Sequence, residues 1–110
     1  MSRRSGAPEI GLCTGKDCRR ADGFRTVERE LARACTVLEL PCLDVCDGVM
    51  VVIEPRSSEA VVLERVGTRA LALEVVDHVV DGEPLSGRLR KRRLTGTKRA
   101  KARRRVERAL

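Results

Sequence analysis

Apolar and polar positions alternate in short runs through most of the chain, and each run predicts one strand or one helix. In residues 9–13, polar or small side chains alternate with apolar ones, as they do in a half-buried strand. In residues 24–35, apolar side chains recur at helical spacing and charged side chains occupy the other side, which predicts an amphipathic helix. Asp22 stands where the N-cap of this helix is expected.

The middle of the chain predicts three further strands. Residues 36–40 form a short strand that ends before Pro41, and residues 49–53 are a continuous apolar run typical of a buried strand. Residues 60–63 return as the second strand of a hairpin after a turn at residues 55–58.

A second helix follows the hairpin. Thr68 is its expected N-cap, a broad apolar stripe runs from Leu71 to Val80, and Gly82 and Pro84 give the expected stop. The predicted order is therefore β-α-β-β-β-α, an α/β fold.

Charge divides the chain into two parts. Residues 1–81 carry 11 Lys/Arg and 14 Asp/Glu, a net charge of −3, whereas residues 82–110 carry 12 and 2, a net charge of +10. We expect one domain over residues 8–84 and a basic tail over residues 85–110, disordered or helical only in part. Residues 98–110 contain good helix formers and are expected to become helical against an acidic partner.

Two pairs of cysteines carry the candidate chemistry. Cys13 and Cys18 have four residues between them, and Cys42 and Cys46 have three. Neither a secretory signal nor a membrane-spanning run is evident, so we expect a cytoplasmic protein in which clustered thiols bind metal rather than form disulfides. The chain contains a single aromatic residue, a phenylalanine, so its core is expected to be thin. A metal centre that cross-links the loops would stabilise such a core.

The spacing leaves the identity of the metal open. The pairs follow the strands at residues 9–13 and 36–40, so the four sulfurs converge if a βαβ crossover makes these strands neighbours. Both zinc and an iron–sulfur cluster tolerate such spacing, although zinc modules more often place two residues between paired ligands. Spacing therefore favours iron–sulfur without excluding zinc.

The motifs Cys-Thr-Gly-Lys-Asp-Cys and Cys-Leu-Asp-Val-Cys-Asp-Gly, each after a strand, resemble those of the thioredoxin-like [2Fe–2S] ferredoxins. The cluster domain of the small peripheral subunit of respiratory complex I is similar. The resemblance covers about residues 8–84. The segment between the two pairs is short for the family, and the basic tail is an addition.

The resemblance implies a thioredoxin-like sandwich that holds a [2Fe–2S] cluster on Cys13, Cys18, Cys42 and Cys46. It implies an electron carrier rather than an enzyme, with a redox partner protein, and a homodimer is one expected state because several family members are dimers. Lys16, Arg19 and Arg20 would stabilise the anionic cluster, whereas Asp44 and Asp47 would oppose reduction.

The other features have simpler interpretations. Cys35 lies at the end of the apolar face of the first helix and is predicted to be a buried structural thiol. His78 lies in the second helix, far in sequence from the cysteines. The tail would attract nucleic acid or acidic proteins non-specifically. The alternative function is thus a zinc-stabilised interaction module whose tail contacts nucleic acid or an acidic protein.

Overall fold

The computed structural model describes residues 7–110 and has an α/β fold, which confirms the predicted class. Its sheet consists of β1 (Glu9–Cys13), β2 (Thr36–Leu40), β3 (Val51–Ile53) and β4 (Val61–Leu63). The helices in this part of the chain are α1 (Lys16–Arg20), α2 (Phe24–Ala34), α3 (Arg69–Asp81), α4 (Gly87–Arg90) and α5 (Gly96–Ala109).

The four strands form one mixed sheet in the order β2-β1-β3-β4. β1 and β2 are parallel, so Cys13 at the end of β1 lies opposite Leu40 at the end of β2. β3 pairs antiparallel with both β1 and β4. Since two neighbouring parallel strands end at the same edge of the sheet, the segments that follow β1 and β2 begin side by side. These segments carry Cys18, Cys42 and Cys46, and Cys13 is the last residue of β1 itself.

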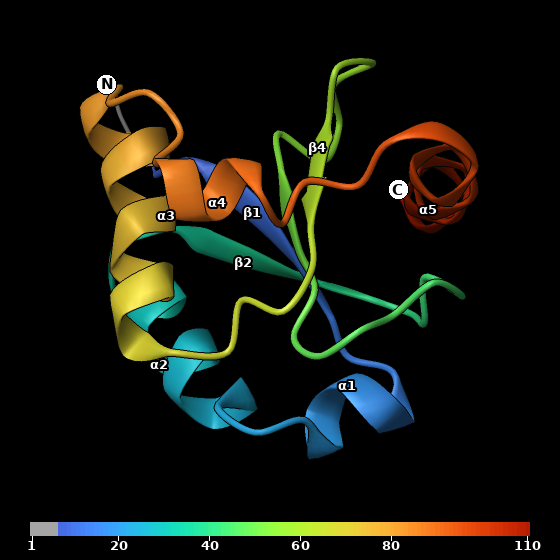
Figure 1. Cartoon of the computed structure of the whole chain (residues 1–110), viewed down its shortest axis with the longest axis horizontal. Coiled ribbons are helices and arrows are strands. Elements are labelled where there is room, and N and C mark those ends of the chain that lie inside the picture. Colours follow the sequence, from blue (N-terminus) through green and yellow to red (C-terminus); the bar gives the residue numbers. More distant parts are fainter. Residues whose placement is uncertain (1–6) are drawn as a thin grey trace.

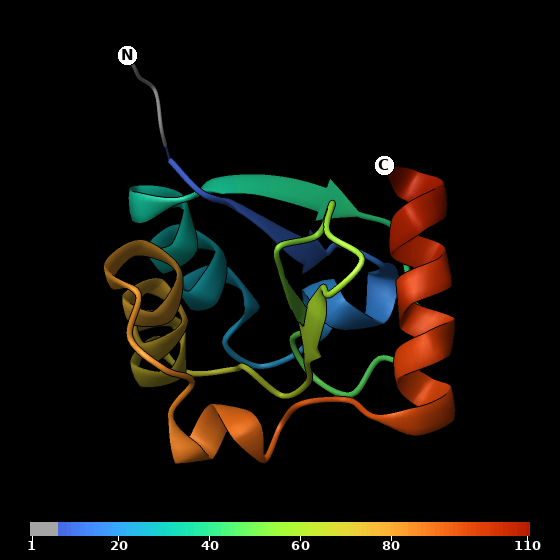
Figure 2. The ribbon, with the colours of Figure 1, turned by 90° about the horizontal axis from the view of Figure 1, so that it is seen from above.

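Helices lie on both sides of this sheet, with α2 and α3 over one face and α5 over the other (Figures 1 and 2). Alternate residues of each strand point to opposite faces. In β3, Val51 and Ile53 pack in the cluster under α2 and α3, whereas Val52 packs in the cluster that includes Ala102 and Val106 of α5. The two central strands, β1 and β3, are therefore covered on both faces, and the face toward α5 also carries Cys13.

The segment after residue 84 is folded onto the domain, whereas a disordered or only partly helical tail was expected. Residues 92–94 continue along the edge of the sheet, where Leu94 N–H donates to Val62 O (2.9 Å). This pairing leads the chain into α5, which is helical against its own sheet rather than against an acidic partner. Ala102 and Val106, which lie one turn apart on α5, are both buried against the domain. The division of the chain at residue 84 stays a prediction.

The predicted order β-α-β-β-β-α is incomplete, because the structure adds α1, α4 and α5. The third strand begins at Val51 rather than at residue 49. The caps of α3 are confirmed: Thr68 Oγ1 accepts from Leu71 N–H, and Gly82 ends the helix at a φ of 74°. Among residues 7–110, no helix is long and apolar enough to cross a membrane.

The predicted N-cap of α2 is wrong. Gly23, not Asp22, is the N-cap, and its φ is 86°. A Cβ at position 23 would lie 1.8 Å from the carbonyl oxygen of Gly67, so only glycine fits where these two segments cross. The N-cap position is therefore set by the contact with Gly67, a residue distant in sequence, and the local sequence does not show this contact.

Candidate metal centre

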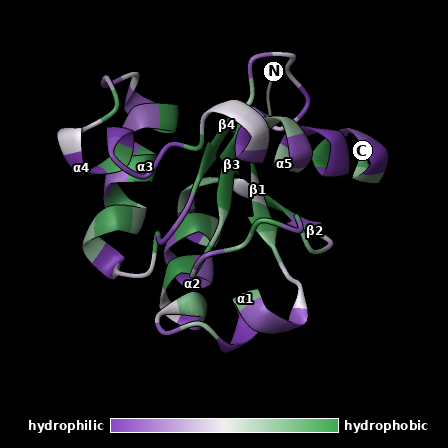
Figure 3. Cartoon of the chain, turned by 45° about the vertical axis from the view of Figure 1, so that its right-hand side comes forward, coloured by the Kyte–Doolittle hydropathy of each residue, from purple (hydrophilic) through white to green (hydrophobic). Residues whose placement is uncertain are grey.

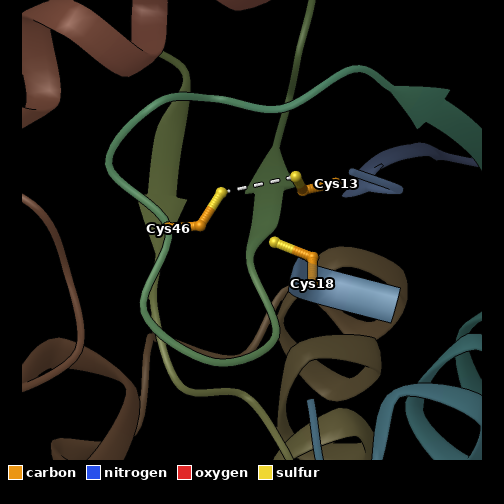
Figure 4. Close-up of side chains that lie close together, drawn as sticks. All are labelled: Cys13, Cys18 and Cys46. Atoms are coloured by element: carbon orange, nitrogen blue, oxygen red, sulfur yellow. Dashed lines mark hydrogen bonds between the residues drawn. The ribbon is translucent and has the colours of Figure 1, made fainter. Parts of the chain in front are cut away.

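Three cysteines from the two sequence motifs meet at the edge of the sheet. The Sγ atoms of Cys13, Cys18 and Cys46 all lie within 4.8 Å of one another (Figure 4). The Sγ atoms of Cys13 and Cys46 are 3.5 Å apart although the residues are 33 positions apart in sequence. This group of three thiols, called here the cysteine trio, can hold a metal ion.

Each member of the trio comes from a different element. Cys13 is the last residue of β1, and its N–H donates to Met50 O (3.1 Å), which fixes the end of the strand. Cys18 lies in α1, the short helix that turns the chain back after β1. Cys46 lies in the loop between β2 and β3, at residues 41–50, called here the cysteine loop. The antiparallel return of the chain into β3 brings this loop back over Cys13.

Cys42, the fourth predicted ligand, does not join the trio. Its side chain is exposed, and its Sγ accepts from the N–H of Asp44 (3.4 Å). Its backbone nevertheless lies against the turn between Cys13 and Cys18. A Cβ at Gly15 would be 2.9 Å from the Cys42 Cβ and 3.1 Å from its Cα. The close approach of the two motifs therefore depends on the absence of a side chain at position 15, where φ is −61°.

The three thiols of the trio have different proton affinities. The hydrogen bond with Cys46 lowers the pKa of Cys13 to about 5, and backbone hydrogen bonds from Gly15 and Leu43 act in the same direction. Burial raises the pKa of Cys18 to about 12. The pKa of Cys46 is also raised, first by its hydrogen bond to Cys13 and then by burial. A cation bound here would therefore have to displace protons from Cys18 and Cys46.

The trio borders an apolar cluster that extends to α5. Cys13 and Cys18 belong to a buried cluster with Leu43 of the cysteine loop and with Ala102 and Val106 of α5. Residues 96–109 were expected to belong to a separate tail, so their packing in this cluster was not predicted. The spacing of Ala102 and Val106 at i and i+4 was the available signal, but two small residues among many cations are a weak one.

The charged residues that flank the cysteines are largely paired. Asp44 lies 3.4 Å from Arg105 of α5, and Asp47 lies 3.8 Å from Arg65. Arg19 donates through Nε to the carbonyl oxygen of Thr14 (2.9 Å). Asp44 and Asp47 were expected to oppose reduction of a cluster. Arg105 and Arg65, their ion-pair partners, offset the negative charge of these two carboxylates. All four side chains of the two ion pairs are exposed, so each pair contributes little to stability.

The remaining predicted residues lie away from the trio. Cys35 is the C-cap of α2 and is buried in the cluster under α2 and α3, and burial raises its pKa. This confirms its assignment as a buried thiol. His78 lies in α3, and its Nδ1 is 2.6 Å from Glu83 O. The five cysteines, all within the described residues, form no disulfide.

No protein-family model, curated protein or solved structure matches this chain. The fold and the trio themselves therefore define the class to which the protein can be assigned. It is a small α/β protein with a candidate thiolate metal centre at one edge of a mixed sheet.

Proposed function

We propose that the chain is an electron-transfer protein that binds a [2Fe–2S] cluster through Cys13, Cys18, Cys42 and Cys46. The observation that carries this proposal is the convergence of thiols from both cysteine motifs within 4.8 Å. Thiolates arranged in two short pairs are the donor set that iron–sulfur clusters use. A redox partner would exchange single electrons with the protein, and no substrate would be transformed.

The residues at the site fit such a group. Cys13 and Cys18 are buried and held by β1 and α1, so two donors are already oriented. Cys46 is half-buried on the cysteine loop, and the exposed Cys42 side chain is free to change rotamer. When bound, the cluster supplies a centre that accepts and donates one electron. The apolar side chains of Leu43 and Val106 would limit the access of water to it.

The thioredoxin-like assignment rests on the sequence motifs and is supported by the topology. A parallel pair, β1 and β2, lies beside the antiparallel strands β3 and β4. Both cysteine segments follow the parallel pair, which is the arrangement that the motifs implied. A cytoplasmic location and assembly as a homodimer belong to the same proposal.

Anaerobic reconstitution with iron and sulfide tests the proposal directly. We expect a reddish-brown protein with two irons and two sulfides per chain and a one-electron EPR signal on reduction. Cys13→Ser and Cys42→Ser should each lose most of the cluster, whereas Cys35→Ser, the matched control for a buried thiol outside the trio, should keep it. Full cluster content in Cys42→Ser would overturn the four-ligand assignment.

One observation favours a second function, a zinc-stabilised interaction module. Four thiolates around one tetrahedral zinc, with Zn–S bonds of about 2.3 Å, lie about 3.8 Å from one another. The 3.5 Å separation of the Cys13 and Cys46 sulfurs is close to that value. This function predicts a colourless protein that purifies with one zinc per chain and no sulfide, so metal analysis of the purified protein separates the two functions.

A further inference from the structure

The outward face of α5 carries a continuous row of cations. Lys101, Arg104, Arg105 and Arg108 are all exposed and lie at i, i+3, i+4 and i+7, so they form one stripe along the helix, called here the basic stripe. Most of α5 is hydrophilic where it faces solvent (Figure 3). Ala102 and Val106, on a different face of the helix, are buried against the domain. The stripe is therefore presented by a helix that is packed on the domain.

The basic stripe lies directly beside the cysteine loop. Arg105 is 3.4 Å from Asp44, which stands midway between Cys42 and Cys46. Asp44 and all four cations of the stripe line one surface pocket of about 180 Å³. A molecule held on the stripe would thus contact the loop that carries two of the four candidate ligands.

We propose that the basic stripe is the docking surface for a redox partner protein with a carboxylate-rich surface. This inference rests on the proposed electron-transfer function and names the chemistry of the partner. Among residues 7–110, no carboxylate lies within ion-pair distance of Lys101, Arg104 or Arg108, so their charges are available to a partner. Guanidinium groups pair with carboxylates through two parallel hydrogen bonds, which gives orientation as well as attraction.

The stripe suits an acidic protein better than nucleic acid. Asp44 lies among the cations and interrupts the positive surface, whereas the phosphates of a duplex form an unbroken row of negative charge. The chain contains no asparagine, glutamine, tyrosine or tryptophan, and its one phenylalanine, Phe24, is buried in α2. It therefore lacks the aromatic platforms on which single-stranded bases stack and the amides that read adenine.

The test uses the full chain reconstituted with iron and sulfide. The probe is a fluorescein-labelled polyglutamate peptide of about 20 residues, and binding is followed by anisotropy. In Lys101→Glu/Arg108→Glu we expect the affinity to fall at least about tenfold relative to the unchanged protein, and the difference should shrink between about 50 and 300 mM salt. The matched control, Arg29→Glu/Lys91→Glu, reverses one Arg and one Lys at exposed positions outside α5 and should change the affinity less than about twofold.

Three outcomes would overturn the docking surface. Equal loss in both double variants would mean that net charge alone attracts the probe. Tighter binding of a duplex DNA than of polyglutamate, lost in the stripe variant, would assign the stripe to nucleic acid. Loss of self-association in sedimentation, with no change in polyglutamate binding, would assign it to a second copy of the chain.

Voltammetry separates failure of this inference from failure of the proposed function. The reconstituted protein should exchange one electron with gold covered by a carboxylate-terminated monolayer, at least about tenfold faster than the stripe variant does. With a soluble mediator the two proteins should be reduced equally. If neither is reduced by the mediator while polyglutamate binding still depends on the stripe, the electron-transfer function is wrong, and the stripe binds an acidic protein that is not a redox partner.

Discussion

Replacing Gly15 by alanine tests the contact that holds the two cysteine motifs together. The φ of −61° at Gly15 suits alanine, so the substitution introduces no backbone strain. The added Cβ would lie 2.9 Å from the Cys42 Cβ and 3.1 Å from its Cα, whereas carbon atoms in contact prefer about 3.5–4.0 Å. The two segments must therefore separate by roughly 0.5–1 Å.

The expected magnitude follows from two opposing effects. Overpacking of this kind costs about 1–3 kcal/mol, whereas alanine stabilises by about 0.4–1 kcal/mol because it restricts the unfolded chain. Gly87→Ala is the matched control, because a Cβ there has no atom within 4 Å. Since both variants share the effect on the unfolded chain, Gly15→Ala should be less stable than Gly87→Ala by about 1–3 kcal/mol.

Urea denaturation of the reduced, metal-free proteins measures this difference. Because the clash pushes the Cys42 segment away from Cys13 and Cys18, Gly15→Ala should also retain less metal after reconstitution than Gly87→Ala. If the two variants are equally stable and hold equal amounts of metal, the close approach at Gly15 does not hold the site together, and the reasoning fails.

Three further predictions concern the surroundings of the site. Val106→Ala should lower the free energy of unfolding by about 2 kcal/mol in urea denaturation and speed metal loss to a chelator, because it removes two methyl groups from the buried cluster that also contains Cys13 and Cys18. Ser86 and Arg88 both donate to Glu74 and lower its pKa, so this carboxylate stabilises the fold above its ordinary pKa of 4.5 and stops doing so as pH falls through its lowered pKa. Glu74→Gln should therefore unfold more easily at neutral pH, and thermal melts should show the difference from the unchanged protein disappearing in acid. Cys35→Ala should keep full metal content while unfolding at lower urea, and a loss of metal would place this thiol at the site.

The pattern of apolar and polar residues predicted an element best where the side chains of that element and its immediate neighbours determine its ends. Thr68 and Gly82 bound α3 as expected, and the alternation in residues 9–13 gave β1 its correct length. Both succeed because a cap or an alternating strand is a property of neighbouring residues. Asp22 failed as a cap because the crossing of Gly67 over Gly23, 44 residues away in sequence, sets that turn.

The candidate site was predictable only in part, because contacts between residues distant in sequence also determine which thiols lie together. The position of each cysteine pair at the end of a predicted strand placed all four cysteines at one sheet edge, and the parallel pairing of β1 with β2 gave the edge that was expected. Spacing did not say which thiols would touch. The trio unites Cys13 and Cys18 with Cys46, and leaves Cys42 outside, because α1 and the cysteine loop orient each side chain differently.

The sequence by itself determined the α/β class, the soft thiol chemistry of the candidate ligands and the concentration of positive charge after residue 81, since each depends on residue type and local order. Only the tertiary structure decided that α5 folds back over the sheet. Its docking through Ala102 and Val106 places the basic stripe beside the cysteine loop. That placement comes from contacts of α5 with β4 and with Asp44, which lie more than thirty positions away in sequence, and the free energy of such contacts depends on shape and burial that no local pattern records.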